Sequence, residues 1–223
     1  MKVFLYLCIA IFDIGKFMDL KERIITITIQ QTTQVGVSST TMDHIARLCG
    51  ISKRTLYELF PDKLTLLTEA MRYSINKQRT KLSEIIANAN NPLEALLHIY
   101  ANIRNQINST SRVMIEDIRR LYPSLYQVYL DEHTNNNRHF VNMLKKAQNQ
   151  GLVRKNANIK AAVAGFSVLI HHVKGENFDY AIHAPFSEKD VLDESFITLI
   201  RGLASSESIA TIDRFLENFD KKQ

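Results

Sequence analysis

Residues 41–60 read TMDHIARLCGISKRTLYELF, and this stretch predicts two short helices joined by a tight turn. In its first half, apolar residues recur at helical spacing, at Met42, Ile45, Ala46 and Cys49. Gly50 can adopt a left-handed backbone without a Cβ clash, so we expect the first helix to end there. Ser52 is a favourable N-cap for a second helix. The expected buried side of that helix carries Leu56, Leu59 and Phe60.

Two helices joined in this way form a helix-turn-helix, whose second helix can enter the major groove of DNA. The first turn of that second helix carries three hydrogen-bond donors, Lys53, Arg54 and Thr55. Cations are mildly unfavourable at a helix N-terminus because the macrodipole is positive there, so a polyanionic partner explains them best. Packing of a helix face would explain Leu56 and Phe60 equally well, but it would not explain the cations. The motif therefore predicts contacts with phosphates and base edges.

The pattern continues on both sides of the motif, with Thr40 before it and Lys63 after it. Taken together, residues 40–63 resemble the TetR (tetracycline-repressor, AcrR-like) family of bacterial transcriptional regulators. The residues that carry the resemblance are Thr40, Thr41, Met42, Ile45, Ala46, Cys49, Gly50, Ile51, Ser52, Lys53, Thr55, Leu56, Tyr57, Phe60 and Lys63. The resemblance implies a phosphate contact by Lys63 and the helix that it opens. The candidate DNA-binding residues are Thr40, Thr41, Ser52, Lys53, Arg54, Thr55, Tyr57 and Lys63.

The composition agrees with a helical globular protein that has a basic segment. Of the 223 residues 45% are apolar and 23% are charged, and only 7 Gly and 4 Pro favour long helices with few turns. The formal net charge is +5. Residues 19–81 hold ten Lys and Arg against six Asp and Glu, so +4 of this excess surrounds the motif. A local basic excess fits a polyanionic partner.

The predicted fold is all-α, with an N-terminal three-helix DNA-binding domain and a C-terminal helical effector-binding and dimerisation domain. We expect residues 18–80 to form the first domain, with the motif at 41–60, and residues 81–223 to form the second. The first helix is expected at 19–35, although the β-branched run 24–29 favours a strand. The resemblance also departs here, because the family's first helix carries an aromatic residue near Thr32. The later helices are expected at 63–89, 92–103, 109–121, 123–150, 159–173, 188–203 and, more weakly, 204–223.

Residues 1–17 form an apolar N-terminal extension. The run from Val3 to Phe12 follows Lys2 and resembles the start of a signal peptide, but no clear cleavage site follows it. The run is also too short to span a bilayer. We favour a natural start at Met18, or an extension that lies outside the fold. Membrane tethering is the alternative.

Two apolar helices near the C-terminus, 159–173 and 188–203, predict a homodimer interface. Small residues within the first, at 161–165, would let another helix approach closely. An intramolecular core is the alternative reading of both helices. A symmetric dimer would bind double-stranded DNA on a pseudo-palindromic operator.

The helices after Pro92 carry Tyr and Met faces that could line a pocket with a few polar groups. The candidate ligand-binding residues are Tyr100, Asn105, Met114, Tyr122, Tyr126 and Tyr129. Residues of these kinds at helical spacing lie in a core more often than in a ligand wall. The resemblance implies a small apolar or amphipathic effector.

The chain lacks the patterns of an enzyme or a metalloprotein. Cys8 and Cys49 form no disulfide framework and no zinc spacing occurs. His171 and His172 are adjacent, so on a helix they point about 100° apart, which is poor for chelation. We therefore expect no cofactor, no metal site and no catalytic activity. The expected function is a cytoplasmic transcriptional regulator, a repressor released from DNA by its effector; the alternative is a TetR-like DNA-binding protein with a partner-protein or non-transcriptional role and no ligand.

Overall fold

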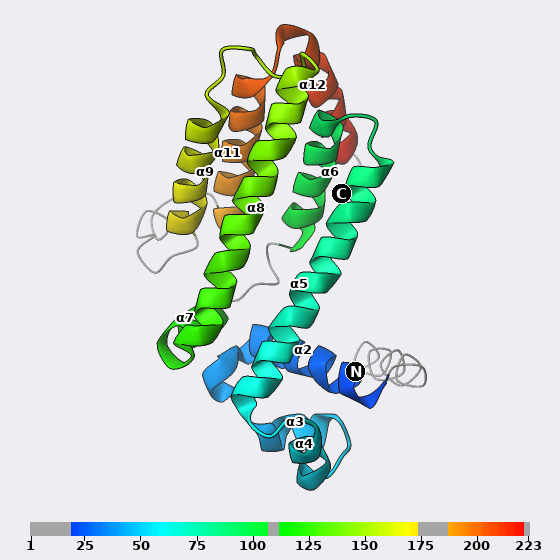
Figure 1. Ribbon diagram of the computed structural model, residues 1–223, viewed down its shortest axis with the longest axis vertical. Coiled ribbons are helices and arrows are strands. Elements are labelled where there is room, and N and C mark those ends of the chain that lie inside the picture. The colour runs from blue at the N-terminus through cyan, green and yellow to red at the C-terminus, as the bar shows by residue number, and fades with distance from the viewer. Residues whose placement is uncertain (1–18, 107–111, 174–186, 221–223) are drawn as a thin grey trace. The chain divides into compact units, whose positions relative to one another are not determined.

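The computed structural model describes residues 19–106, 112–173 and 187–220, which are helical almost throughout (Figure 1). Within this part of the chain the one β-bridge pairs Val153 with Ala204. The all-α prediction is confirmed. The helices are α2 (Leu20–Ser39), α3 (Met42–Leu48), α4 (Lys53–Leu59), α5 (Lys63–Asn88), α6 (Pro92–Gln106), α7 (Arg112–Leu121), α8 (Pro123–Asn149), α9 (Ile159–Val173), α11 (Glu188–Leu203) and α12 (Ser206–Asp220).

The described helices form two compact units. Unit 1 contains the described residues up to Lys77 together with Val113–Leu125. Unit 2 contains the described residues of Gln78–Arg112 and Tyr126–Gln223, so α5 begins in unit 1 and ends in unit 2. The division after Lys77 lies close to the expected boundary at residue 80. The segment Val113–Leu125 differs from expectation, because it belongs to unit 1 although the sequence alone places it in a second domain.

The first helix of unit 1, α2, forms in spite of its β-branched run. Thr28 is buried, and its hydroxyl donates to the carbonyl of Ile24 at 2.8 Å. Thr32 is buried as well, and its hydroxyl donates to the carbonyl of Thr28 at 2.9 Å. Each threonine thus satisfies its own polar group inside the core, which explains why a helix tolerates them there. At Gly36 the backbone leaves helical geometry, with φ +83°.

The core of unit 1 lies where α2, α3, α4 and the start of α5 meet. Its buried residues are Ile24, Ile25, Met42, Ile45, Ala46, Cys49, Leu56, Phe60, Leu66 and Ala70. Leu59, which was expected on the buried side of α4, is instead 37% exposed. Leu56 defines the buried face, and a residue three positions later points about 60° away from it around the helix.

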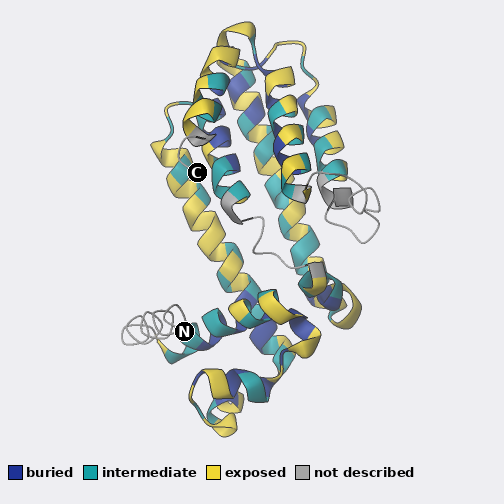
Figure 2. Ribbon diagram, turned by 180° about the vertical axis from the view of Figure 1, so that it is seen from behind, coloured by how far each residue is buried: buried dark blue, intermediate teal, exposed yellow. Residues whose placement is uncertain are grey.

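The core of unit 2 is built from α6, α8, α9, α11 and α12. Helices α9 and α11 lie side by side (Figure 1). Figure 2 shows that the buried positions gather on the sides of the helices that face one another. Tyr100 stacks on Phe196 with ring centroids 4.2 Å apart, and its hydroxyl donates to Asp193 at 2.6 Å.

Candidate nucleic-acid interface

The turn between α3 and α4 has the local geometry that the sequence predicts. Thr41 caps α3, because its side-chain oxygen accepts the backbone N–H of His44 at 3.2 Å. Gly50 takes a left-handed backbone, with φ +63°, and ends the first helix. Ser52 then caps α4 by accepting the backbone N–H of Thr55 at 3.0 Å. Local hydrogen bonds therefore define the start of each helix, and Gly50 ends the first one.

The first turn of α4 presents polar side chains to solvent. Lys53 and Arg54 are exposed, and Thr55 shares a 2.8 Å hydrogen bond with Ser52. Tyr57 is 46% exposed although its neighbour Leu56 is fully buried. An aromatic ring left outside the core, beside two cations, is available to contact a partner.

Both cations of this turn form ion pairs within unit 1. Lys53 pairs with Asp43 on α3, and the Arg54 Nε lies 2.9 Å from the Glu58 carboxylate one turn later. Ion pairs between exposed side chains contribute little free energy, about 0–1 kcal/mol. A polyanion can therefore compete for these cations at low cost.

Two candidate contacts, Thr40 and Lys63, are engaged inside unit 1. Thr40 is buried, and its hydroxyl donates to the carbonyl of Gly36 at 2.8 Å. The ammonium of Lys63 donates to the carbonyl of Val37 at 2.6 Å. Burial lowers the pKa of Lys63, whereas the nearby Asp117 acts to raise it. The ammonium has three N–H donors, so one bond to Val37 leaves others for a phosphate.

The N-terminus of α5 is capped by a carboxylate. Asp62 accepts the backbone N–H of Thr65 at 2.7 Å, and this bond is the main cause that lowers the pKa of Asp62. The cap places a negative charge beside Lys63, at the position where the resemblance implies a phosphate contact. Any phosphate must therefore approach from the side of the Lys63 ammonium.

The candidate ligand residues fall into both units. Tyr126 and Tyr129 lie together in unit 2, with ring centroids 5.9 Å apart, and burial raises the pKa of Tyr129. Tyr100 belongs to the unit 2 core, where it contacts Phe196 and Asp193 as described above. Met114 and Tyr122 belong to unit 1, and the Met114 sulfur lies 3.9 Å from the Thr33 hydroxyl. The side chain of Asn105 lies outside the described residues.

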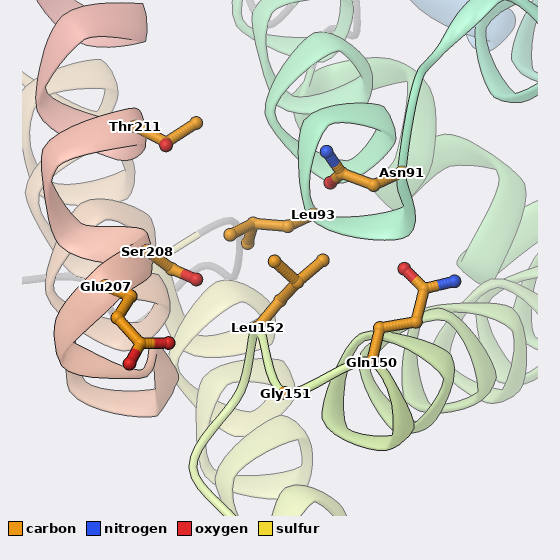
Figure 3. Close-up of a pocket in the computed structure, with 8 residues that line it drawn as sticks. All are labelled: Asn91, Leu93, Gln150, Gly151, Leu152, Glu207, Ser208 and Thr211. Carbon is orange, nitrogen blue, oxygen red and sulfur yellow. The ribbon is translucent and has the colours of Figure 1, made fainter.

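A surface pocket of about 190 Å³ lies in unit 2, and none of the candidate ligand residues lines it. Figure 3 shows its lining, which comes from the start of α6 and the residue before it, from the turn after α8 and from the first turns of α12. The lining residues are Asn91, Leu93, Gln150, Gly151, Leu152, Glu207, Ser208 and Thr211. It is an open depression with no concentration of charge.

The part of the chain that the structure describes offers neither a metal site nor a membrane span. No three His, Cys, Asp or Glu side chains there come together as ligands for a metal ion. Helices long and apolar enough to cross a bilayer are likewise absent from these residues. The paired histidines at 171 and 172 lie outside the residues whose side chains are described.

The fold and the capped α3–α4 pair define a helical protein with an N-terminal helix-turn-helix. Residues 24–70 match the family described as bacterial regulatory proteins, tetR family. This match confirms the resemblance over the region of the helix-turn-helix. The family is one of regulators, which agrees with the expectation that the chain is not an enzyme.

A curated relative shares the N-terminal region. The uncharacterized HTH-type transcriptional regulator YerO of Bacillus subtilis (strain 168) is 40% identical over 65 residues. This match covers 29% of the present chain and 22% of YerO, so the chain spans well under two thirds of that relative.

Solved structures resemble the fold over most of the chain. The ketosteroid transcriptional regulator KstR2 of Mycobacterium tuberculosis has a TM-score of 0.59 at 18% identity, covering 84% of this chain and 96% of that one. A gamma-butyrolactone receptor (ArpA-like protein) has a TM-score of 0.66 at 17% identity, covering 90% and 96%. At these identities the likeness is one of fold.

Proposed function

We propose that this chain is a DNA-binding transcriptional regulator that acts in the cytoplasm as a homodimer and is released from its operator by a small effector. The observation that carries the proposal is the first turn of α4. Lys53 and Arg54 stand exposed there on a capped helix, and only weak surface ion pairs hold them. Cations in this position favour phosphates and base edges as partners. The match of residues 24–70 to the tetR family supports the same conclusion.

The dimer interface in this proposal is the outward face of α9 together with α11. Among the described side chains of α9, the exposed positions are Lys160, Ala161, Ala164, Gly165 and Val168, and Val168 is 70% exposed. A Cβ added at Gly165 or at Gly202 of α11 would meet nothing within 4 Å. Small residues on outward faces allow two helices of a partner chain to approach closely. A two-fold dimer then requires a pseudo-palindromic site.

The proposed effector is a small apolar or amphipathic molecule bound among the helices of unit 2. The names of the two fold neighbours refer to a ketosteroid and to gamma-butyrolactone. Both chemistries combine apolar carbon with a carbonyl oxygen. In unit 2 the stacked pair Tyr126 and Tyr129 offers aromatic surface and hydroxyl groups that suit such a molecule.

The test begins with selection of DNA by the purified full chain. Duplexes with a randomised core of about 30 base pairs accommodate two half-sites one to two helical turns apart. We expect enrichment of a pseudo-palindrome, and binding that weakens steeply with salt because phosphate contacts release counterions. Sedimentation at micromolar concentration should show a dimer. Failure to enrich any sequence, combined with salt-independent binding, would reject the proposal.

The alternative role, recruitment of a partner protein without a ligand, makes a different prediction for the selected duplex. A 3-ketosteroid and an alkyl γ-butyrolactone serve as the first effector probes, since they represent the two neighbouring chemistries. A compound that binds the chain and weakens its hold on the duplex favours effector control. If neither these two probes nor a broad panel of apolar compounds lowers the affinity of the chain for the selected duplex, the partner role is favoured.

A further inference from the structure

Helix α7 follows α6 in the chain, yet its residues from Val113 onward belong to unit 1. Its contacts there centre on residues 36–40, the junction that joins the end of α2 to the start of α3. Asp117 of α7 is 5% exposed, and one of its oxygens, Oδ2, accepts two hydrogen bonds from Ser38. Both the backbone N–H and the hydroxyl of Ser38 donate, each at 2.7 Å. A buried carboxylate with these bonds holds the junction firmly.

Gly36 shows how closely the junction and α7 approach each other. Its φ of +83° lies in the region that L side chains rarely adopt. A Cβ placed there would lie 2.8 Å from Asp117 Oδ2 and 2.8 Å from Val113 Cγ1. Glycine is therefore favoured at position 36 for two reasons: its φ is strained for other residues, and a Cβ would clash with Asp117 and Val113.

The junction is also held by residues outside α7. Lys63, the first residue of α5, donates to the carbonyl of Val37, and Thr40 donates to the carbonyl of Gly36. Thr41, the next residue, caps α3. The carboxylate of Asp117 and the ammonium of Lys63 thus hold neighbouring residues of one short segment, from which the helix-turn-helix starts.

The ionisation of Asp117 agrees with these hydrogen bonds. Burial acts to raise the pKa of Asp117, but the hydrogen bonds from Ser38 and the nearby Arg120 outweigh it, so the pKa lies below its ordinary value. The carboxylate is therefore charged at neutral pH. Its neighbour Lys63 is a cation of the same cluster.

We propose that Asp117 is a positioning residue for DNA recognition: it fixes residues 36–40 and thereby the placement of α3 and α4. The DNA-binding unit would then be discontinuous in sequence, made of α2 to the start of α5 plus α7. This inference rests on the proposed function. Base contacts need hydrogen-bond geometry, whereas lysine and arginine contacts with phosphates tolerate displacement. Loss of Asp117 should therefore weaken specific binding more than non-specific binding.

The experiment uses full-length Asp117→Ala, Asp117→Asn and Ser38→Ala chains. Each variant is titrated with the duplex selected by the wild-type chain and with a scrambled duplex of equal length. The temperature is kept well below the melting temperature of every variant, and the fraction of protein that can bind DNA is measured first. We expect Asp117→Ala to lose about tenfold in affinity for the selected duplex, as loss of a charged hydrogen bond implies, and less than about threefold for the scrambled one. Asp117→Asn should fall between, because an amide oxygen can still accept from Ser38.

Two comparisons separate positioning from simple loss of stability. Gly36→Ala should reduce the ratio of specific to non-specific affinity as Asp117→Ala does. Gly151→Ala, at a similar φ of +76° with nothing near its Cβ, carries the backbone cost alone and should leave the ratio unchanged. In the double variant that combines Ser38→Ala with Asp117→Ala, the ratio of specific to non-specific affinity should fall by less than the product of the two single effects. The reason is that both substitutions remove the hydrogen bond from the Ser38 hydroxyl to Asp117.

Equal losses on both duplexes, or an unchanged ratio in Asp117→Ala, would overturn the positioning role. Additive losses in the double variant would do the same. If the wild-type chain itself enriched no duplex, the proposed function would fail first, and that result is distinct from either outcome. If Asp117→Ala does not fold, Asp117→Asn and Gly36→Ala still test the positioning role, because each should lower the ratio of specific to non-specific affinity.

Discussion

At the scale of single residues, the exposed and the half-buried cations of unit 1 have different surroundings. Arg54 is exposed and is paired only with Glu58 on its own helix. Lys63 is partly buried and bonded to a backbone carbonyl of the junction. We therefore expect the exposed Arg54 to reach a base edge. Lys63, which is bonded to the junction, should support the fold and contact only the phosphate backbone of DNA.

Arg54→Ala and Lys63→Met should therefore differ in kind. Arg54→Ala is expected to cost about 1–3 kcal/mol on the selected duplex and to relax sequence preference. Lys63→Met should lower the melting temperature, because the Val37 carbonyl loses one of its two donors and keeps only the Thr40 N–H. It should also reduce the salt slope by about one. Binding titrations at several salt concentrations, with reselection of DNA by each variant, measure both effects. Lys63→Met with altered sequence preference and an unchanged slope would contradict this assignment.

The charge of Asp117 predicts a pH dependence of stability. Its pKa is lowered in the folded chain, so its contribution is complete above the unfolded pKa of about 3.9 and is lost as pH falls through the folded value. Wild type should exceed Asp117→Asn by about 1–3 kcal/mol at pH 7. The difference should stay constant down to about pH 5 and shrink below about pH 4. Denaturant unfolding across this range measures it, and a difference that grows on acidification would refute the prediction.

At the scale of helices, α4 and α11 start with the same kind of cap but face different tasks. Ser52 and Ser187 each accept a backbone N–H in the first turn of their helix. Aspartate is as good an N-cap as serine. Replacing Ser52 by aspartate should therefore keep the cap of α4 and change only the charge at the start of this helix.

Ser52→Asp should retain stability and lose affinity for the selected duplex by about tenfold, because its carboxylate would approach phosphates. Ser187→Asp is the control, since it adds the same charge at the start of α11, where it would face the Asp190 carboxylate that Ser187 now donates to. We expect Ser187→Asp to unfold at a lower temperature than wild type but to bind the duplex as wild type does. Ser52→Asp should show the reverse, with unchanged thermal unfolding and weaker binding. Undiminished binding by Ser52→Asp would place Ser52 away from DNA.

The outward face of α9 makes a prediction about assembly. Val168→Glu would put a charge within the proposed dimer interface, where burial without a partner is costly. We expect this variant to sediment as a monomer at concentrations where wild type is a dimer. Ile209→Glu, at an apolar residue of α12 that is 38% exposed, controls for added charge and should stay dimeric. A dimeric Val168→Glu chain would assign the interface to another surface.

At the scale of the whole molecule, the proposed function couples effector and operator through one equilibrium. A ligand can shift that equilibrium only by its differential affinity for the two states, typically about 1–3 kcal/mol. By linkage, the selected duplex must weaken effector binding by the same factor. Calorimetric titration of any compound that raises the melting temperature, with and without the duplex, tests this reciprocity. Equal affinities in both titrations would exclude that compound as an inducer.

Much of the helix-turn-helix was predictable from sequence alone, because its signals are local. The caps Thr41 and Ser52 and the left-handed Gly50 act within four residues of themselves. Helix periodicity likewise predicted α5, α8 and α9 to within a few residues. The β-branched run of α2 favoured a strand by local propensity, yet the expected helix forms, because threonine hydroxyls can bond back to their own helix.

Contacts between distant residues were decided only by the tertiary structure. Asp117 and Ser38 are 79 positions apart, and Tyr100 and Asp193 are 93 apart, so no spacing rule connects them. The same holds for α7, whose amphipathic pattern predicts a helix but not the unit against which it packs. Periodicity identifies the face that a helix buries, whereas its partner follows from complementary shape and charge, which arise only when all the elements pack together.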